Sequence, residues 1–115
     1  MAPEVLSGTL DVRFFSNFQK ADVYSFGLII WECVRRLQFG GVADEYRQPY
    51  FEFVDNNPGM EEMERVVVFE KMRPGFSDGQ RECLGELCDL AEECWLKEGD
   101  DRPTMLRVKK TLEKV

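Results

Sequence analysis

The pattern of apolar and polar positions along the chain is helical rather than strand-like. Apolar residues recur at spacings of three and four in several separate stretches, whereas sustained alternation with a period of two is absent. Spacings of three and four place side chains on one face of an α-helix, and alternation would place them on one face of a strand. The sequence therefore predicts an all-α fold.

The first long stretch, residues 21–37, is apolar on nearly all of its faces. One stripe at helical spacing consists of Val23, Phe26, Ile30, Cys33 and Leu37. Tyr24, Leu28 and Trp31 cover much of the other side, which is typical of a core helix with neighbours all round. Asp22 precedes the run, where a carboxylate caps N–H groups and suits the helix dipole. We therefore predict a buried central helix that begins at Asp22.

Three further helices are expected in residues 60–115, after a long loop over residues 38–59. Gly, Pro and Asn residues predict the loop, and its aromatic residues indicate that it packs against the protein. The helices are expected over residues 60–71, over residues 80–95 and from residue 103 onwards. Their apolar stripes are Met60, Met63 and Val67, then Leu84, Leu87, Cys88, Ala91 and Trp95, and finally Met105, Val108, Leu112 and Val115. These helices do not fully cover the central one, so we expect additional chain to pack on it.

Composition excludes several classes of protein. The formal net charge is −7 and the isoelectric point is about 4.7. Nucleic-acid binding usually shows a basic face, so the acidic balance argues against it and no nucleic-acid partner is expected. The longest apolar run is far shorter than the roughly 20 residues of a membrane-spanning helix, and the N-terminus lacks the pattern of a signal peptide. We therefore expect no membrane contact by this segment itself.

Side chains with obvious catalytic or metal-binding chemistry are few. The chain contains no histidine and has four cysteines, none of which form a Cys-x-x-Cys pair. This argues against a zinc site and against histidine-based catalysis. All of the cysteines, which are Cys33, Cys83, Cys88 and Cys94, lie in apolar helical patterns. They are expected to be small buried hydrophobic residues in a reducing compartment.

Five short motifs, in order along the chain, resemble the C-terminal lobe of a protein kinase. They are Ala2-Pro3-Glu4, which closes the activation segment in kinases; Asp22-Val23-Tyr24-Ser25-Phe26-Gly27 with Trp31-Glu32, from helix F; Arg73-Pro74, after helix G; Cys94-Trp95, ending helix H; and Asp101-Arg102-Pro103-Thr104, before helix I. The resemblance extends over the whole chain. It implies an incomplete kinase domain with helices F, G, H and I, in which residues 1–20 hold the end of the activation segment and the following loop.

Finer features are similar to receptor serine/threonine kinases of the transforming growth factor β and activin family, type I receptors above all. They include Gly40-Gly41-Val42, Asp44-Glu45-Tyr46, Pro49-Tyr50, Glu61-Glu62-Met63, Val66-Val67 and residues 106–112. The resemblance implies a parent kinase on the cytoplasmic side of a membrane receptor, with type II receptors and Smad proteins as partners. Two motifs, Tyr24-Ser25-Phe26-Gly27 and Arg102-Pro103-Thr104, are instead forms common in tyrosine-kinase-like enzymes. The C-terminal lobe of another such subfamily is therefore an alternative.

The resemblance also assigns roles to individual residues. Glu4 would pair with Arg102 and anchor the end of the activation segment to the turn between helices H and I, unless the two charges are separately exposed. Asp22 would direct its carboxylate to backbone amides of the catalytic loop, a role compatible with capping. The pocket for the residue after the phosphorylated one would be bordered by Met1, Ala2 and Pro3.

The residues that perform phosphoryl transfer in kinases are missing from this sequence. It contains no Gly-x-Gly-x-x-Gly, no His-Arg-Asp and no Asp-Phe-Gly, and in kinases all of these precede Ala-Pro-Glu. We therefore expect no catalytic, ATP-binding or metal-binding residue here. ATP and Mg would belong to the parent kinase, and the remainder of the kinase domain would be the main partner. The alternative is a non-catalytic helical module that binds another protein.

Overall fold

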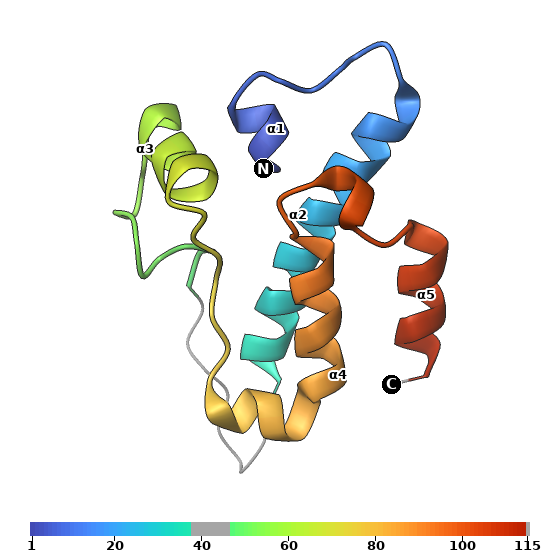
Figure 1. Cartoon of the computed structure of the whole chain (residues 1–115). Coiled ribbons are helices and arrows are strands. Elements are labelled where there is room, and N and C mark those ends of the chain that lie inside the picture. Colours follow the sequence, from blue (N-terminus) through green and yellow to red (C-terminus); the bar gives the residue numbers. More distant parts are fainter. Residues whose placement is uncertain (38–46, 115) are drawn as a thin grey trace.

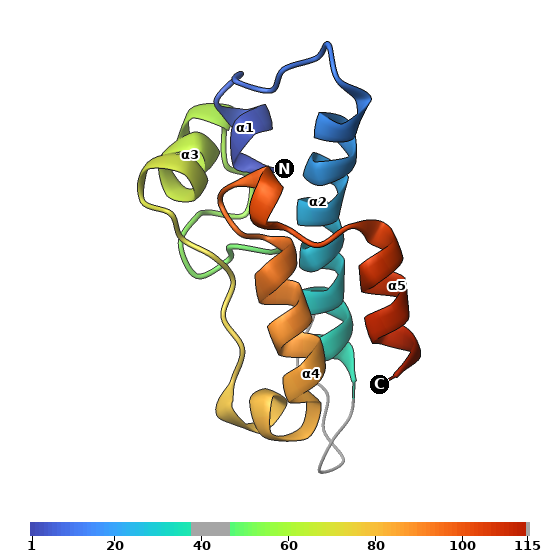
Figure 2. The same cartoon turned by 45° about the vertical axis from the view of Figure 1, so that its right-hand side comes forward.

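A computed structural model of the chain describes residues 1–37 and 47–114, and all regular elements in these ranges are helices. The elements are α1 (Pro3–Leu6), α2 (Phe15–Arg36), α3 (Met60–Glu64), the π-helix η1 (Arg65–Phe69), α4 (Asp78–Cys94), the 3-10 turn η2 (Gly99–Asp101) and α5 (Met105–Glu113). Helices α2 and α4 run antiparallel at the centre (Figure 1), with α3 on one side of this pair and α5 on the other (Figure 2). The predicted all-α fold is confirmed.

Helix α2 begins at Phe15, well before the predicted start. Phe14 takes the N-cap position with extended backbone and makes no side-chain cap bond. The Asn17 side chain instead stabilises the N-terminal end of α2, because its Nδ2 donates to the Asp11 carbonyl oxygen at 3.0 Å. Asp22 lies inside the helix and is exposed, so the prediction that it caps the helix is wrong. The helix extends this far because no Pro or Gly interrupts the residues before Asp22.

The buried face of α2 differs in part from the predicted stripe. Tyr24, Trp31 and Val34 are fully buried, with 0% of each residue exposed. Cys33 and Leu37, which the stripe places inward, are exposed. Spacing along a helix identifies a possible apolar face, but the position of the neighbouring helix decides which residues are covered.

The close approach of α2 and α4 depends on Gly27. A Cβ atom at this position would lie 2.9 Å from Cys94 Cβ and 3.0 Å from the Ala91 carbonyl oxygen. These distances are shorter than normal packing contacts, and the second involves backbone that cannot easily move. The absence of a side chain at Gly27 therefore sets the distance between the two central helices.

We expect Gly27→Ala to lower the free energy of unfolding by about 1–3 kcal/mol, because the added methyl group overpacks this contact. This loss is expected although Ala is a better helix former than Gly by about 1 kcal/mol. Urea unfolding of the purified chain is the measurement. Gly79→Ala is the matched control, since a Cβ there meets nothing within 4 Å. Similar stabilities of the two variants would contradict the role of Gly27.

After the loop, the α-helix α3 continues directly into the wider π-helix η1. The Glu70 backbone N–H donates to the Arg65 carbonyl oxygen at 2.8 Å, a π-helical bond. The wider turn brings both Val66 and Val67 into the core, where each is 1% exposed. Met60 is 59% exposed, so its predicted place in the apolar stripe is wrong, whereas that of Val67 is confirmed.

Side-chain caps define the starts of α4 and α5. The Ser77 hydroxyl accepts from the Gln80 backbone N–H at 3.2 Å, and Gln80 Oε1 accepts from the Ser77 N–H at 2.8 Å, a capping box. The Thr104 hydroxyl accepts from the Arg107 backbone N–H at 3.2 Å. Both helices therefore begin close to their predicted positions, and the central part of the α4 stripe, including Cys88, is buried.

The four cysteines divide into two pairs. Cys88 and Cys94 are buried, and burial raises the pKa of the Cys94 thiol to about 11, so this thiol stays protonated near neutral pH. Cys33 and Cys83 are exposed, so the prediction that they are buried hydrophobic residues is wrong. An apolar pattern alone does not reveal which residues at the ends of a helix lack a covering neighbour.

The described part of the predicted loop, residues 47–59, packs against α2. Tyr50 is 2% exposed and has a positive φ of 68°, and the Phe51 ring lies 6.2 Å from the Trp31 ring. The expected packing of the loop aromatics is thus confirmed for Tyr50. Some residues of the receptor-like motifs, and one residue of the last apolar stripe, lie outside the described residues: Gly40, Gly41, Val42, Asp44, Glu45, Tyr46 and Val115.

Candidate functional site

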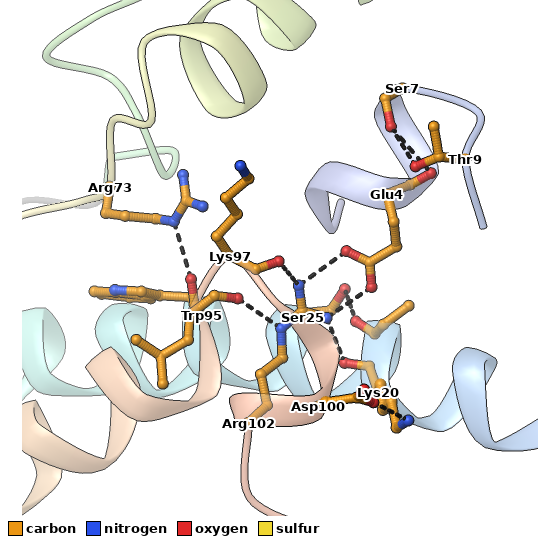
Figure 3. Close-up of polar contacts among 12 residues, drawn as sticks. Glu4, Ser7, Thr9, Lys20, Ser25, Arg73, Trp95, Lys97, Asp100 and Arg102 are labelled. Carbon is orange, nitrogen blue, oxygen red and sulfur yellow. Dashed lines mark hydrogen bonds and ion pairs between the residues drawn. The ribbon is translucent and has the colours of Figure 1, made fainter.

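Arg102 lies at the centre of a buried hydrogen-bond network (Figure 3). Its Nη1 donates to Glu4 Oε2 at 2.7 Å and its Nη2 donates to Glu4 Oε1 at 2.8 Å. The Arg102 side chain is 0% exposed and the Glu4 side chain 21% exposed. A bidentate arrangement of this kind matches the planar guanidinium fork to a carboxylate. The structure therefore brings together the two residues that the sequence pairs by resemblance.

The other N–H groups of Arg102 bind backbone carbonyls. Its Nε donates to Leu96 O at 2.7 Å, its Nη1 to Lys20 O at 2.9 Å and its Nη2 to Lys97 O at 3.0 Å. A guanidinium has five N–H donors, and each of them here has an acceptor. One side chain thereby joins α1 through Glu4, α2 through Lys20 and the turn after α4.

The Glu4 carboxylate is held in its charged form. Burial by itself would raise the pKa of Glu4, but the hydrogen bonds and positive charge of Arg102 outweigh burial. The folded-state pKa therefore lies below the ordinary glutamate value. A lowered folded-state pKa means that the interaction stabilises the fold above the unfolded-state pKa and is lost as the pH falls through the folded-state pKa.

Lys20 holds the 3-10 turn η2 against the N-terminal part of α2. Its Nζ forms an ion pair with Asp100, and its Cβ lies 3.2 Å from where a Cβ at Gly99 would be. The Asp100 side chain is 86% exposed, so the ion pair itself contributes little to stability. The main contribution of Lys20 is the carbonyl that accepts from Arg102.

Sequence reasoning missed two further residues of this network, Arg73 and Tyr24. Arg73 Nε donates to Trp95 O at 3.0 Å and its Nη1 donates to Val67 O at 3.0 Å. The Tyr24 ring centroid lies 5.3 Å from Arg73 Cζ and 5.1 Å from Arg102 Cζ. Both residues belong to the quoted kinase motifs, but nothing in their spacing shows that their side chains meet.

The remaining predicted site residues do not join this network. Asp22 is exposed on α2, and its expected role toward a catalytic loop concerns residues that this sequence does not contain, so it stays a prediction. The pocket border expected at Met1, Ala2 and Pro3 also stays a prediction. Met1 is 54% exposed, whereas Ala2 and Pro3 are buried.

In residues 1–37 and 47–114 no group of three or more metal-ligating side chains comes together. None of the helices described is long and apolar enough to cross a membrane. The hydrogen bonds of Arg102 to Glu4 and to three backbone carbonyls fit a structural junction between three segments of backbone.

Comparison with known proteins identifies the family. The family model for the protein tyrosine and serine/threonine kinases matches residues 1–112, which is nearly the whole chain. The chain therefore belongs to the protein kinase family, and its helices correspond to the helical C-terminal lobe of a kinase domain.

Similarity to individual proteins narrows the group. The chain is 42% identical over 117 aligned residues to activin receptor type-1C of Rattus norvegicus, 39% identical to TGF-beta receptor type-1 of Homo sapiens and 42% identical to activin receptor type-1B of Homo sapiens. Each alignment covers 100% of this chain but only 24%, 23% and 23% of the respective relatives. The chain thus spans about a quarter of the length of these receptors.

Proposed function

We propose that this chain is the C-terminal part of the kinase domain of a type I receptor serine/threonine kinase of the transforming growth factor β and activin class. The parent would transfer the γ-phosphate of ATP to Ser or Thr of protein substrates. The observation that carries the kinase part of the proposal is the buried, bidentate Glu4–Arg102 ion pair, which would join the end of the activation segment to the turn before the last helix. Similarity to activin and TGF-beta receptors over the whole chain supports it.

Within this proposal the chain supports the chemistry but does not perform it. Residues 1–20 would hold the end of the activation segment, the loop after it and the first turns of α2. Met1, Ala2 and Pro3 would border the substrate pocket, and Asp22 would hold the catalytic loop. ATP, Mg and the catalytic base would belong to the remainder of the kinase domain. Type II receptors and Smad proteins would be partners, on the cytoplasmic side of a membrane.

The test of this proposal is phosphate transfer. We expect the 115-residue chain with ATP and Mg to transfer none to a Smad substrate, because the groups that bind phosphates and metal in kinases are not in its sequence. The product of the coding sequence extended upstream is expected to contain His-Arg-Asp and Asp-Phe-Gly and to phosphorylate Ser or Thr.

Two outcomes would contradict the proposal. Phosphate incorporation by the chain alone would show that its mechanism is different, and phosphotyrosine in the product of the extended protein would favour another kinase subfamily. Analysis of the phosphorylated amino acid distinguishes Ser or Thr phosphorylation from Tyr phosphorylation directly.

A second candidate is a helical module that binds another protein. The observation in its favour is that large apolar side chains are exposed on α2 and α5. Phe15 is 75% exposed, Ile29 is 53% exposed and Leu106 is 61% exposed. Under the main proposal the remainder of the kinase domain covers these residues. A coding sequence that begins at Met1, without kinase motifs upstream, would favour the module.

A further inference from the structure

Two arginines bind three successive carbonyl groups, at the C-cap of α4 and in the turn that follows it (Figure 3). Arg73 Nε donates to Trp95 O at 3.0 Å, and Arg102 donates to Leu96 O at 2.7 Å and to Lys97 O at 3.0 Å. The carbonyl of the C-cap residue Trp95 belongs to the partly negative C-terminal end of α4, so the Arg73 guanidinium stabilises that end. The two arginines therefore depend on the same short turn.

The two guanidinium groups also share one aromatic ring. Both lie over Tyr24, with Cζ-to-centroid distances of 5.3 Å for Arg73 and 5.1 Å for Arg102. An aromatic face attracts cations, and the attraction is larger where water is excluded. Tyr24 is 0% exposed. A displacement of the Tyr24 ring would therefore change the surroundings of both arginines.

The Tyr24 ring is in turn held by Tyr50. The two hydroxyl groups form a buried hydrogen bond, and Tyr50 is 2% exposed. Burial raises the pKa of both hydroxyls, so the pair stays uncharged at neutral pH. Tyr50 is positioned by its own segment, because its carbonyl accepts from the backbone N–H groups of Phe53 at 2.9 Å and of Val54 at 3.2 Å. The positive φ at Tyr50 is a costly conformation for a residue with a side chain, which indicates that the surrounding contacts impose it.

We propose that Tyr50 is a positioning residue for the Glu4–Arg102 ion pair and acts on it through Tyr24. Residues 47–54 and the ion pair are then energetically coupled, although Tyr50 bonds to neither Glu4 nor Arg102. A protein that binds residues 47–54 and moves Tyr50 would loosen the connection between α1 and the turn after α4. The importance of the coupling for signalling rests on the proposed kinase function, but the coupling itself does not.

The first test is the hydrogen exchange of the Arg102 Nε–H group, measured by NMR. Tyr50→Phe keeps the ring and removes only the hydroxyl. We expect the Arg102 Nε–H signal to shift and to exchange about 5-fold faster, which corresponds to the contribution of one hydrogen bond. The signal is assigned by triple-resonance experiments and by its loss in Arg102→Lys. Phe53→Leu is the control in the same segment, and we expect it to leave the chemical shift and the exchange rate of the Arg102 Nε–H signal unchanged.

The second test is a double-mutant cycle read from urea unfolding midpoints. Tyr50→Phe combined with Glu4→Gln is expected to shift the midpoint by less than the sum of the two single shifts. The reference cycle combines Tyr50→Phe with Glu92→Gln, which breaks the distant Arg81–Glu92 ion pair, and is expected to be additive. Additivity in both cycles, or an Arg102 signal that does not change in Tyr50→Phe, would overturn the proposal. Neither measurement requires phosphate transfer, so this inference and the proposed function can fail separately.

Discussion

Glu4→Ala is expected to lower the free energy of unfolding by about 3–5 kcal/mol, the loss typical of a buried ion pair that loses one partner. The substitution leaves the guanidinium of Arg102, whose side chain is 0% exposed, without a counter-charge. Its carbonyl acceptors remain, but they carry no full negative charge. Because the Glu4 side chain is 21% exposed, water can enter the vacated space, which places the expected loss at the lower end of the range. Urea unfolding is the measurement.

The matched control for this prediction is Glu92→Ala. Arg81 and Glu92 also form a bidentate pair, with both distances at 2.9 Å, but both side chains are 43% exposed. Exposed ion pairs contribute about 0–1 kcal/mol, so Glu92→Ala is expected to have little effect. Equal losses in the two variants would show that burial is not the reason for the stability of the Glu4–Arg102 pair.

The pH dependence provides a second measurement for the same pair. The pKa of Glu4 is lower in the folded state than its ordinary value, so the pair stabilises the fold above that value. Stability should decrease as the pH falls from the ordinary glutamate pKa to the lowered pKa of the folded state, because over this range the unfolded state binds the proton more readily than the folded state. The difference in stability between the wild-type chain and Glu4→Ala is therefore expected to shrink in acid.

The existence of the helices could be predicted from local sequence, but not all of their faces and boundaries. The cap at Thr104 is a local hydrogen bond, so the start of α5 was predicted closely. The predicted cap at Asp22 is wrong because acidic residues favour helix starts but are also tolerated at exposed positions inside a helix. The exposure of Cys33 depends on where α4 crosses α2, which no local pattern contains. The inward turn of Val66 depends on a π-helical bond that helical spacing does not predict.

The candidate site was predictable only to the extent that a kinase motif carried it. Glu4 and Arg102 are 98 positions apart, and only the resemblance linked them. The contribution of Arg73 depends on a hydrogen bond from the segment between η1 and α4 to the Trp95 carbonyl. That of Tyr50 depends on a hydroxyl contact with Tyr24. Such contacts arise when segments distant in sequence pack together, so composition and spacing could not predict them.

The second large effect is expected for Trp31→Ala, which should lower the free energy of unfolding by about 3–5 kcal/mol, the range for truncation of a buried Trp. Trp31 is 0% exposed and connects α2 to two other segments. Its indole Nε1 donates to the Gly75 carbonyl oxygen at 2.8 Å, just before α4, and its ring lies 6.2 Å from that of Phe51. Urea unfolding of the variant, compared with Ile29→Ala on an exposed part of the same helix, is the measurement.

Trp31→Phe separates the two contributions of this side chain. It keeps most of the apolar contact with the loop but removes the donor to the Gly75 carbonyl. Gly75 is exposed, so water can replace the indole N–H, and the loss of this bond is expected to cost only about 1 kcal/mol. If Trp31→Phe were instead as destabilising as Trp31→Ala, the hydrogen bond to Gly75 would be the main contribution of Trp31. A small loss would show that α2 holds the loop and the segment before α4 mainly through the buried apolar surface of the indole ring.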